Sequence, residues 1–160
     1  MRRFRQALSQ EENIAILQKC HAGTLALSDQ DNTPYIIPLN YVYYRHKIYF
    51  HCAKAGQKLD IIAQNAKASF CIIEKDDIIP EEFTSHYRSS IIKGTISLID
   101  DEQEKYDVLM EYVKKYSSDF MEEGILEIQR FIKHTCILAL SIDELTGKEA
   151  LELVKQKQNK

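Results

Sequence analysis

Two runs rich in tyrosine and isoleucine, separated by a short polar break, limit what this chain can fold into more than any other feature. The first run extends from Pro34 to Tyr44, and the second begins at Ile48. Aromatic and β-branched residues suit a pleated, half-buried surface, so both runs are predicted strands. The residues from Arg45 to Lys47 form the polar interruption that is expected of a tight reversal between them.

The apolar pattern of the second run stops after Phe50, where the backbone must turn and a helix must start. Gly56 and Lys58 stand at this point. The free N–H groups and the dipole of a helix converge at its N-terminus, and a glycine-containing loop lets an anion approach the backbone there. Because Lys58 adds a full positive charge, the pattern predicts a site for phosphate or another anion.

Periodicity and turn residues predict the other elements. Ser9 and Glu12 have the spacing of a capping box, which starts a helix that Gly23 is expected to end. Gly94 is expected to mark a bulge or a close approach. Further helices are predicted over 56–65, 101–116, 120–132 and 148–157. Further strands are predicted over 24–28, 68–74, 85–99 and 135–143, with a polar excursion over 75–82.

About six strands interrupted by helices lack the regular strand–helix alternation of a doubly wound fold. The sequence therefore favours a mostly β architecture with peripheral helices (α+β), in which antiparallel strands form a closed or half-closed barrel. No internal repeat or linker divides the 160 residues, so we expect a single domain over 1–160.

Composition excludes several classes of protein. Hydrophobic residues make up 44% of the chain and charged residues 28%, as in soluble globular proteins. The net charge of −3 gives no basic surplus for a nucleic-acid partner. Apolar runs are far shorter than the roughly 20 residues of a membrane helix, and the arginine-rich start has no signal-peptide core. We therefore expect no membrane association and a cytoplasmic location.

The four cysteines are widely spaced and form no C-x-x-C pair. His51 and Cys52 are adjacent, but neighbouring side chains of a strand project to opposite faces and cannot easily share a metal ion. We therefore expect free, mostly buried thiols and no metal site.

Four segments carry a family resemblance, and they occur in the family's order along nearly the whole chain. They are Met1–Arg3; Tyr49–Ala53 with Gly56–Leu59; Tyr87–Gly94; and Leu140–Asp143 with Thr146–Lys148. Together they resemble the pyridoxamine-phosphate-oxidase-like flavoproteins, and within that superfamily the nitroimidazole-resistance proteins. The resemblance implies a split β-barrel homodimer that binds FMN at the subunit interface.

The resemblance implies that His51, Cys52, Ala53 and Lys58 belong to the phosphate-binding segment. Lys58 could instead be a solvated lysine, but a lysine in the first turn opposes the helix dipole unless an anion is present. A lone histidine is usually structural. His51 is nevertheless the candidate catalytic residue, because the related proteins carry a histidine beside the cofactor and histidine moves protons near neutral pH.

Another candidate group consists of Tyr87, Arg88 and Ser89. An aromatic ring, the several N–H donors of a guanidinium group and a hydroxyl group suit phosphate and phosphoribityl oxygens. The alternative for Arg88 is an outward-pointing surface arginine. In the resembled family this strand lies against the flavin.

Two further segments are implied by the resemblance. Pro38, Leu39 and Asn40 would pass along the isoalloxazine, although Pro38 could simply mark an edge strand. Thr146, Gly147 and Lys148 would reach the flavin of the partner subunit, whereas their pattern alone predicts a turn and a helix start.

The function implied is that of an FMN-dependent oxidoreductase of the nitroimidazole-reductase type, which takes a small-molecule electron donor and acceptor. Two alternatives stay open. One is a flavin store, sensor or electron carrier without turnover, and the other is a relative that processes pyridoxamine phosphate or haem.

Overall fold

The structure, a computed structural model that describes residues 4–158, is organised around eight antiparallel strands. Their order is β2-β1-β5-β6-β7-β4-β3, and β8 pairs with β6 beside this path. The strands are β1 (Ala22–Ser28), β2 (Pro34–Asn40), β3 (Val42–Tyr44), β4 (Lys47–Ala53), β5 (Lys67–Ile79), β6 (Thr84–Ile99), β7 (Thr135–Ser141) and β8 (Glu144–Glu149). The mostly β, antiparallel architecture expected from the sequence is confirmed. The Met1–Arg3 segment of the resemblance lies outside the described residues.

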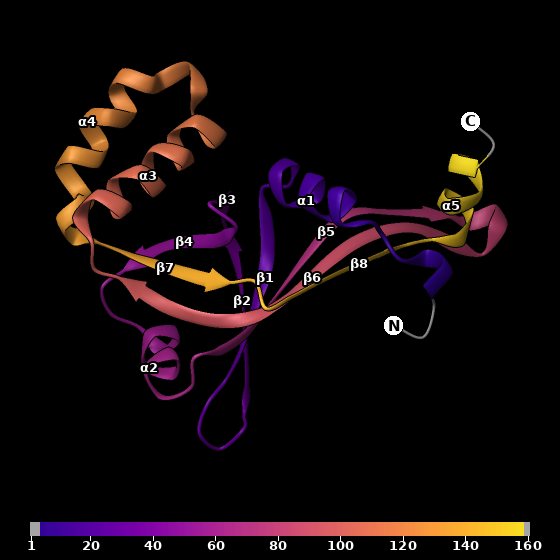
Figure 1. Ribbon diagram of the computed structural model, residues 1–160, viewed down its shortest axis with the longest axis horizontal. Helices are drawn as coiled ribbons and strands as arrows, with labels where there is room; N and C mark the ends of the chain where they lie inside the picture. The colour runs from indigo at the N-terminus through magenta and orange to yellow at the C-terminus, as the bar shows by residue number, and fades with distance from the viewer. Residues whose placement is uncertain (1–3, 159–160) are drawn as a thin grey trace.

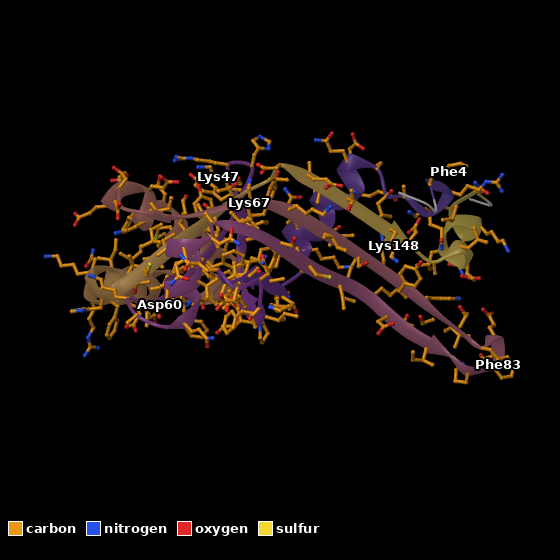
Figure 2. The ribbon with its side chains drawn as sticks, turned by 90° about the horizontal axis from the view of Figure 1, so that it is seen from below. Phe4, Lys47, Asp60, Lys67, Phe83 and Lys148 are labelled. Carbon is orange, nitrogen blue, oxygen red and sulfur yellow. The ribbon has the colours of Figure 1, made fainter. Side chains whose placement is uncertain are left out.

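Helices surround the strands at the periphery, as Figure 1 shows. They are α1 (Gln10–Lys19), α2 (Gln57–Gln64), α3 (Glu102–Tyr116), α4 (Met121–Phe131) and α5 (Leu151–Gln158), with short 3-10 helices at Phe4–Gln6, Pro80–Glu82, Ser118–Phe120 and Ile132–His134. The α3–α4 hairpin covers β4 and β7 on one side, and α2 closes another end. The outer parts of β5 and β6 form an arm that carries Phe83 at its tip, far from α2 (Figure 2).

One long strand joins the two halves of the sheet. The first part of β6 pairs with β5 and β8, whereas Ile96 to Ile99 pair with β7. The change of partner occurs at Gly94, where an added Cβ would lie 1.7 Å from the carbonyl oxygen of Ser141. The close approach expected at Gly94 is therefore confirmed, and the irregularity in the ladder lies between Ile73 and Lys75 of β5.

Local signals in the sequence predict local structure well. The Ser9 hydroxyl accepts from the Glu12 N–H while the Glu12 carboxylate accepts from the Ser9 N–H, which completes the capping box. Arg45 and His46 both have positive φ (46° and 61°), as in the two-residue turns that join antiparallel strands. Gly56, with φ of 141°, caps α2 in a conformation that other residues rarely adopt.

Four expectations were wrong. The first long run is broken at Tyr41 into β2 and β3, and Gly23 lies in β1 while α1 ends earlier at Lys19. The polar stretch 75–79 continues β5, because it pairs along the outer part of β6. Residues 144–149 form β8, so the last helix begins at Leu151 and Thr146 to Lys148 are not a turn and helix start.

Two hydrophobic clusters hold the fold together. The larger fills the barrel, where Phe70 makes edge-to-face contacts with Tyr41 and Phe50 at centroid distances of 5.1 and 5.0 Å. The smaller lies between the outer face of β4 and β7 and helix α3, and includes Tyr49 and Tyr112. Among residues 4–158 no helix is both long and apolar enough to cross a membrane.

Candidate functional site

The predicted phosphate segment lies where β4 ends and α2 begins. The N–H groups of Leu59 and Asp60 donate to the Gly56 carbonyl, and Lys58 stands in the same first turn. The Lys58 charge is close enough to Cys52 of β4 to act on the pKa of its thiol. The structure therefore brings Lys58, Cys52 and Ala53 together at one junction, with a half-buried lysine and a helix N-terminus available to an anion.

His51 projects from the opposite face of β4, toward the α3–α4 hairpin. Its ring meets the Tyr112 ring edge-to-face, with centroids 4.6 Å apart and planes at 80°. His51 as a whole is exposed, while Tyr112 covers one side of its ring. Burial of that side lowers the pKa of His51 below its usual 6.5, so that the neutral imidazole predominates at neutral pH.

A cavity of about 530 Å³ opens beside His51, between the end of β4 and the two helices. Its walls are mainly apolar and aromatic, with Tyr112, Phe120 and Phe131 among them. The charged residues that line it are Glu123 and Glu127. A pocket of this size and composition is typical of small-molecule sites.

A second group of predicted residues lies on the outer face of the other half of the sheet. The strand registers place Pro38, Thr24, Cys71, Ile91 and Thr146 directly opposite one another across β2, β1, β5, β6 and β8. The sequence-predicted residues Pro38 and Thr146 thus share one transverse row, although they are far apart in the chain.

The neighbouring row contains Ile73, Ser89 and Lys148. Lys148 extends its ammonium group over the Tyr87 ring, 5.2 Å from the centroid. This outer sheet face is open and partly apolar, because Ile36 and Ile73 are 64% and 62% exposed. Helices α1 and α2, which contact these strands, pack with buried residues on the inner side.

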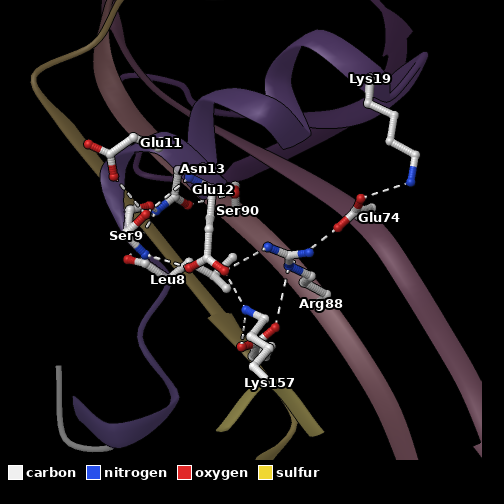
Figure 3. A network of polar contacts seen from close by, with 11 residues as sticks. Leu8, Ser9, Glu11, Glu12, Asn13, Lys19, Glu74, Arg88, Ser90 and Lys157 are labelled. Carbon is white, nitrogen blue, oxygen red and sulfur yellow. Dashed lines mark hydrogen bonds and ion pairs between the residues drawn. The ribbon is translucent and has the colours of Figure 1, made fainter. Parts of the chain in front are cut away.

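Arg88 points away from this face, into a cluster of carboxylates under α1 and α5 (Figure 3). Its Nη2 lies 3.2 Å from Glu12, and its Nε lies 3.4 Å from Glu74 and 3.5 Å from Glu149. The two Nε contacts have ion-pair distances but lack hydrogen-bond alignment. Lys157 of α5 also pairs with Glu12 and Glu149, whose side chain is only 4% exposed.

The charges of this network act on one another. Burial alone would raise the pKa of Glu12, but hydrogen bonds from Lys157 and the Ser9 N–H, with the charges of Lys157 and Arg88, lower it overall. Burial alone would lower the pKa of Lys157, but its bonds to Glu12 and Glu149 raise it. The Arg88 guanidinium is therefore already surrounded by negative charge within its own chain.

Two other predicted residues face inward. Leu39 packs against the barrel core. Gly147 is buried beside α1, where an added Cβ would lie 2.0 Å from Asn13 Oδ1. Asn40 lies at the end of the edge strand β2, and its amide donates to the His21 carbonyl.

Most of the predicted residues thus form two separate groups within one chain, while His51, Arg88, Leu39 and Gly147 face elsewhere. The β4–α2 group lies at the closed end of the barrel, and the outer-face group extends toward the arm, with α2 and α5 on opposite sides of the molecule (Figure 1). No pattern in the sequence indicates the cavity or the carboxylates of Glu74 and Glu149 that surround Arg88.

Comparisons with known proteins identify the family. A family model described as pyridoxamine 5'-phosphate oxidase matches residues 9–149. The chain belongs to this family. A search of curated protein sequences found no match.

Solved structures support the same fold. A conserved hypothetical protein from Mycobacterium tuberculosis superimposes with a TM-score of 0.81 at 14% identity, covering 93% of this chain and 89% of that one. A protein of Bacteroides thetaiotaomicron, described as a candidate 5-nitroimidazole antibiotic resistance protein, gives 0.72 at 18%, covering 89% and 86%. An FAD- and haem-binding protein from Mycobacterium smegmatis gives 0.70 at 22%, covering 92% and 74%. The expected split-barrel fold and family are therefore confirmed.

Proposed function

We propose that this protein is a dimeric FMN-binding flavoprotein that reduces small organic acceptors, as in the nitroimidazole-reductase type. The observation that carries the proposal is the position of Pro38, Ser89, Thr146 and Lys148, from three distant segments, on one open sheet face. Family membership and structural similarity to a flavin-binding protein support it.

The β4–α2 junction fits the phosphate of FMN. The first turn of α2 presents backbone N–H groups, Gly56 keeps the approach free of side-chain atoms, and Lys58 supplies a positive charge. In this proposal Cys52 and Ala53 line the same approach. Bound FMN would supply the capacity to accept and donate electrons.

A homodimer accounts for the separation of the two groups. An open, partly apolar sheet face of this kind marks a protein–protein interface. When two copies pair through it about a two-fold axis, the outer-face residues of one protomer can complete the site of the other. Tyr87, Ser89, Thr146 and Lys148 would then approach the partner's flavin.

Arg88, Leu39, Asn40 and Gly147 have weaker support as flavin contacts. To bind a phosphate, Arg88 would have to give up its carboxylate partners. The negative charges of these carboxylates disfavour the approach of a phosphate. Leu39 and Gly147 would act through the backbone, since their side-chain positions face the interior.

The cavity beside His51 suits the electron acceptor. Its aromatic walls and the carboxylates of Glu123 and Glu127 favour a neutral or cationic aromatic molecule over a phosphorylated one. The neutral His51 imidazole, which lines the cavity, can accept or donate a proton there. Replacing His51 by Gln should lower the single-turnover rate of nitroaromatic reduction by about 10²–10⁴-fold if it transfers the proton, with FMN affinity unchanged.

Flavin binding is tested by titrating FMN and following its fluorescence. Losing a charge-assisted contact of about 1.5–3 kcal/mol should weaken binding roughly 10- to 150-fold in Lys58→Ala. Lys47→Ala, at the other end of β4, is the matched control and should bind like the wild type. Equal affinities in all three proteins, or no binding by the wild type, would overturn the assignment.

The remaining functions are distinguished by simple measurements. Steady-state reduction of an acceptor separates an enzyme from a flavin store or electron carrier. Because one structural neighbour also binds haem, a haem titration followed by its absorbance is the matching test for that alternative.

A further inference from the structure

Two of the four cysteines lie directly opposite each other across the β4–β7 ladder. Cys52 and Cys136 are opposite each other in the antiparallel register; the neighbouring pairs are Ala53 with Thr135 and His51 with Ile137. Both side chains point into the barrel, where Cys136 is buried and Cys52 is half-buried against the same core. Each is a free thiol in this structure.

The geometry of such a position permits a covalent link. Directly opposite residues of antiparallel strands have Cα atoms about 4.5 or 5.5 Å apart. Disulfides span Cα separations of about 4.4–6.8 Å, so either kind of pair lies within range. The other two cysteines have no such neighbour: Cys71 lies opposite Thr24 and Ile91, and Cys20 follows the last turn of α1.

We propose that Cys52 and Cys136 form a dithiol site that a peroxide closes to a disulfide. Cys52 is the more accessible of the two and lies near the positive charge of Lys58, so it reacts first. Cys136, held opposite it by the ladder, is the resolving thiol. The inference does not depend on flavin binding.

The chemistry balances in two steps. The Cys52 thiolate attacks one peroxide oxygen, the O–O bond breaks, and the other oxygen leaves as water or an alcohol after taking up a proton. The product at Cys52 is a sulfenic acid. The Cys136 sulfur then attacks Cys52 Sγ, its proton and the sulfenic hydroxyl leave as water, and the S–S bond forms. The two thiols lose two electrons, which reduce the peroxide.

The surroundings of Cys52 set the pH dependence of this reaction. Burial, and then the neighbouring Cys136, raise the pKa of the Cys52 thiol to about 11, against the effect of Lys58. Tyr112 of α3 is the other titratable group that interacts with it. Because the thiolate is the nucleophile, the rate of closure should rise about tenfold for each pH unit between about pH 7 and 9.

The test is treatment of the purified protein with hydrogen peroxide, with and without FMN, followed by peptide mapping without reduction. The expected product is lighter than the starting protein by two hydrogen atoms and contains a Cys52–Cys136 cross-linked peptide. A protein in which Cys20 and Cys71 are both serine should form it at the same rate. Cys136→Ser should instead accumulate a sulfenic acid on Cys52 that dimedone traps.

Several outcomes would contradict the proposal. One is a folded wild-type protein whose only oxidised thiols are Cys20 or Cys71. Another is a Cys52–Cys136 link that forms only after unfolding in urea, because the native ladder would then not hold the pair in place. Since peptide mapping uses the wild type, the result stands even where a variant fails to fold.

Discussion

Removing Arg88 should destabilise the protein even when no flavin is present. The Arg88→Met substitution keeps much of the side-chain volume but leaves Glu12, Glu74 and Glu149 facing one another. Breaking a buried ion pair typically costs about 3–5 kcal/mol. Lys157 still pairs with two of the carboxylates, and the Arg88 side chain is 23% exposed, so we expect about 3 kcal/mol.

For a chain of this size each kcal/mol lowers the thermal midpoint by about 2–4 °C, so the expected decrease is roughly 6–12 °C. Thermal unfolding followed by circular dichroism at neutral pH, without FMN, measures it. Arg45→Met is the matched control, because Arg45 forms a surface pair with Asp107 that should contribute about 1 kcal/mol or less. Adding Glu149→Gln to Arg88→Met should recover part of the loss.

The same variants decide between two roles for Arg88. If Arg88→Met unfolds at the same temperature as Arg45→Met, the ion pairs of Arg88 with the carboxylates do not stabilise the fold. If its stability is unchanged while FMN affinity collapses, Arg88 is a flavin ligand, as the sequence pattern indicated.

Two further predictions concern pH and packing. Glu12 has a pKa below 4.5 in the folded state, so its contribution to stability is present above pH 4.5 and is lost as the pH falls through the folded pKa. Urea unfolding measured at a series of pH values below 4.5 should show this loss of stability, and Glu12→Gln should not show it. Gly94→Ala places a Cβ against the backbone oxygen of Ser141 and should lower the thermal midpoint far more than Gly124→Ala, whose Cβ would have side-chain atoms of Val113 as its nearest neighbours.

The sequence predicted best those features that depend on residues close together in the chain. The capping box of α1, the turn at Arg45 and His46, and the glycine before α2 each involve a few neighbouring residues with strong backbone preferences. These signals are sufficient to indicate the β4–α2 junction, at which Cys52 and Lys58 stand close together in the chain.

Features that depend on partners distant in the sequence were missed. The outer part of β5 is polar, and only its pairing with β6 makes it a strand. β8 is short and holds a glycine, and it too is defined by its pairing with β6. The partners of Arg88 come from positions 12, 74 and 149, so no local pattern could show that its charge is already compensated.

In the proposed assembly, FMN binds to a dimer that forms through the open sheet face. Sedimentation velocity, with protein and flavin absorbance recorded together, measures the dimer and its bound flavin in one experiment. The proposal predicts that flavin sediments with a dimer at one FMN per protomer, and that Ile73→Glu, on the outer face, yields a folded monomer that has lost the flavin. Flavin that sediments with a wild-type monomer, or an Ile73→Glu protein that remains a flavin-bound dimer, would contradict the proposal.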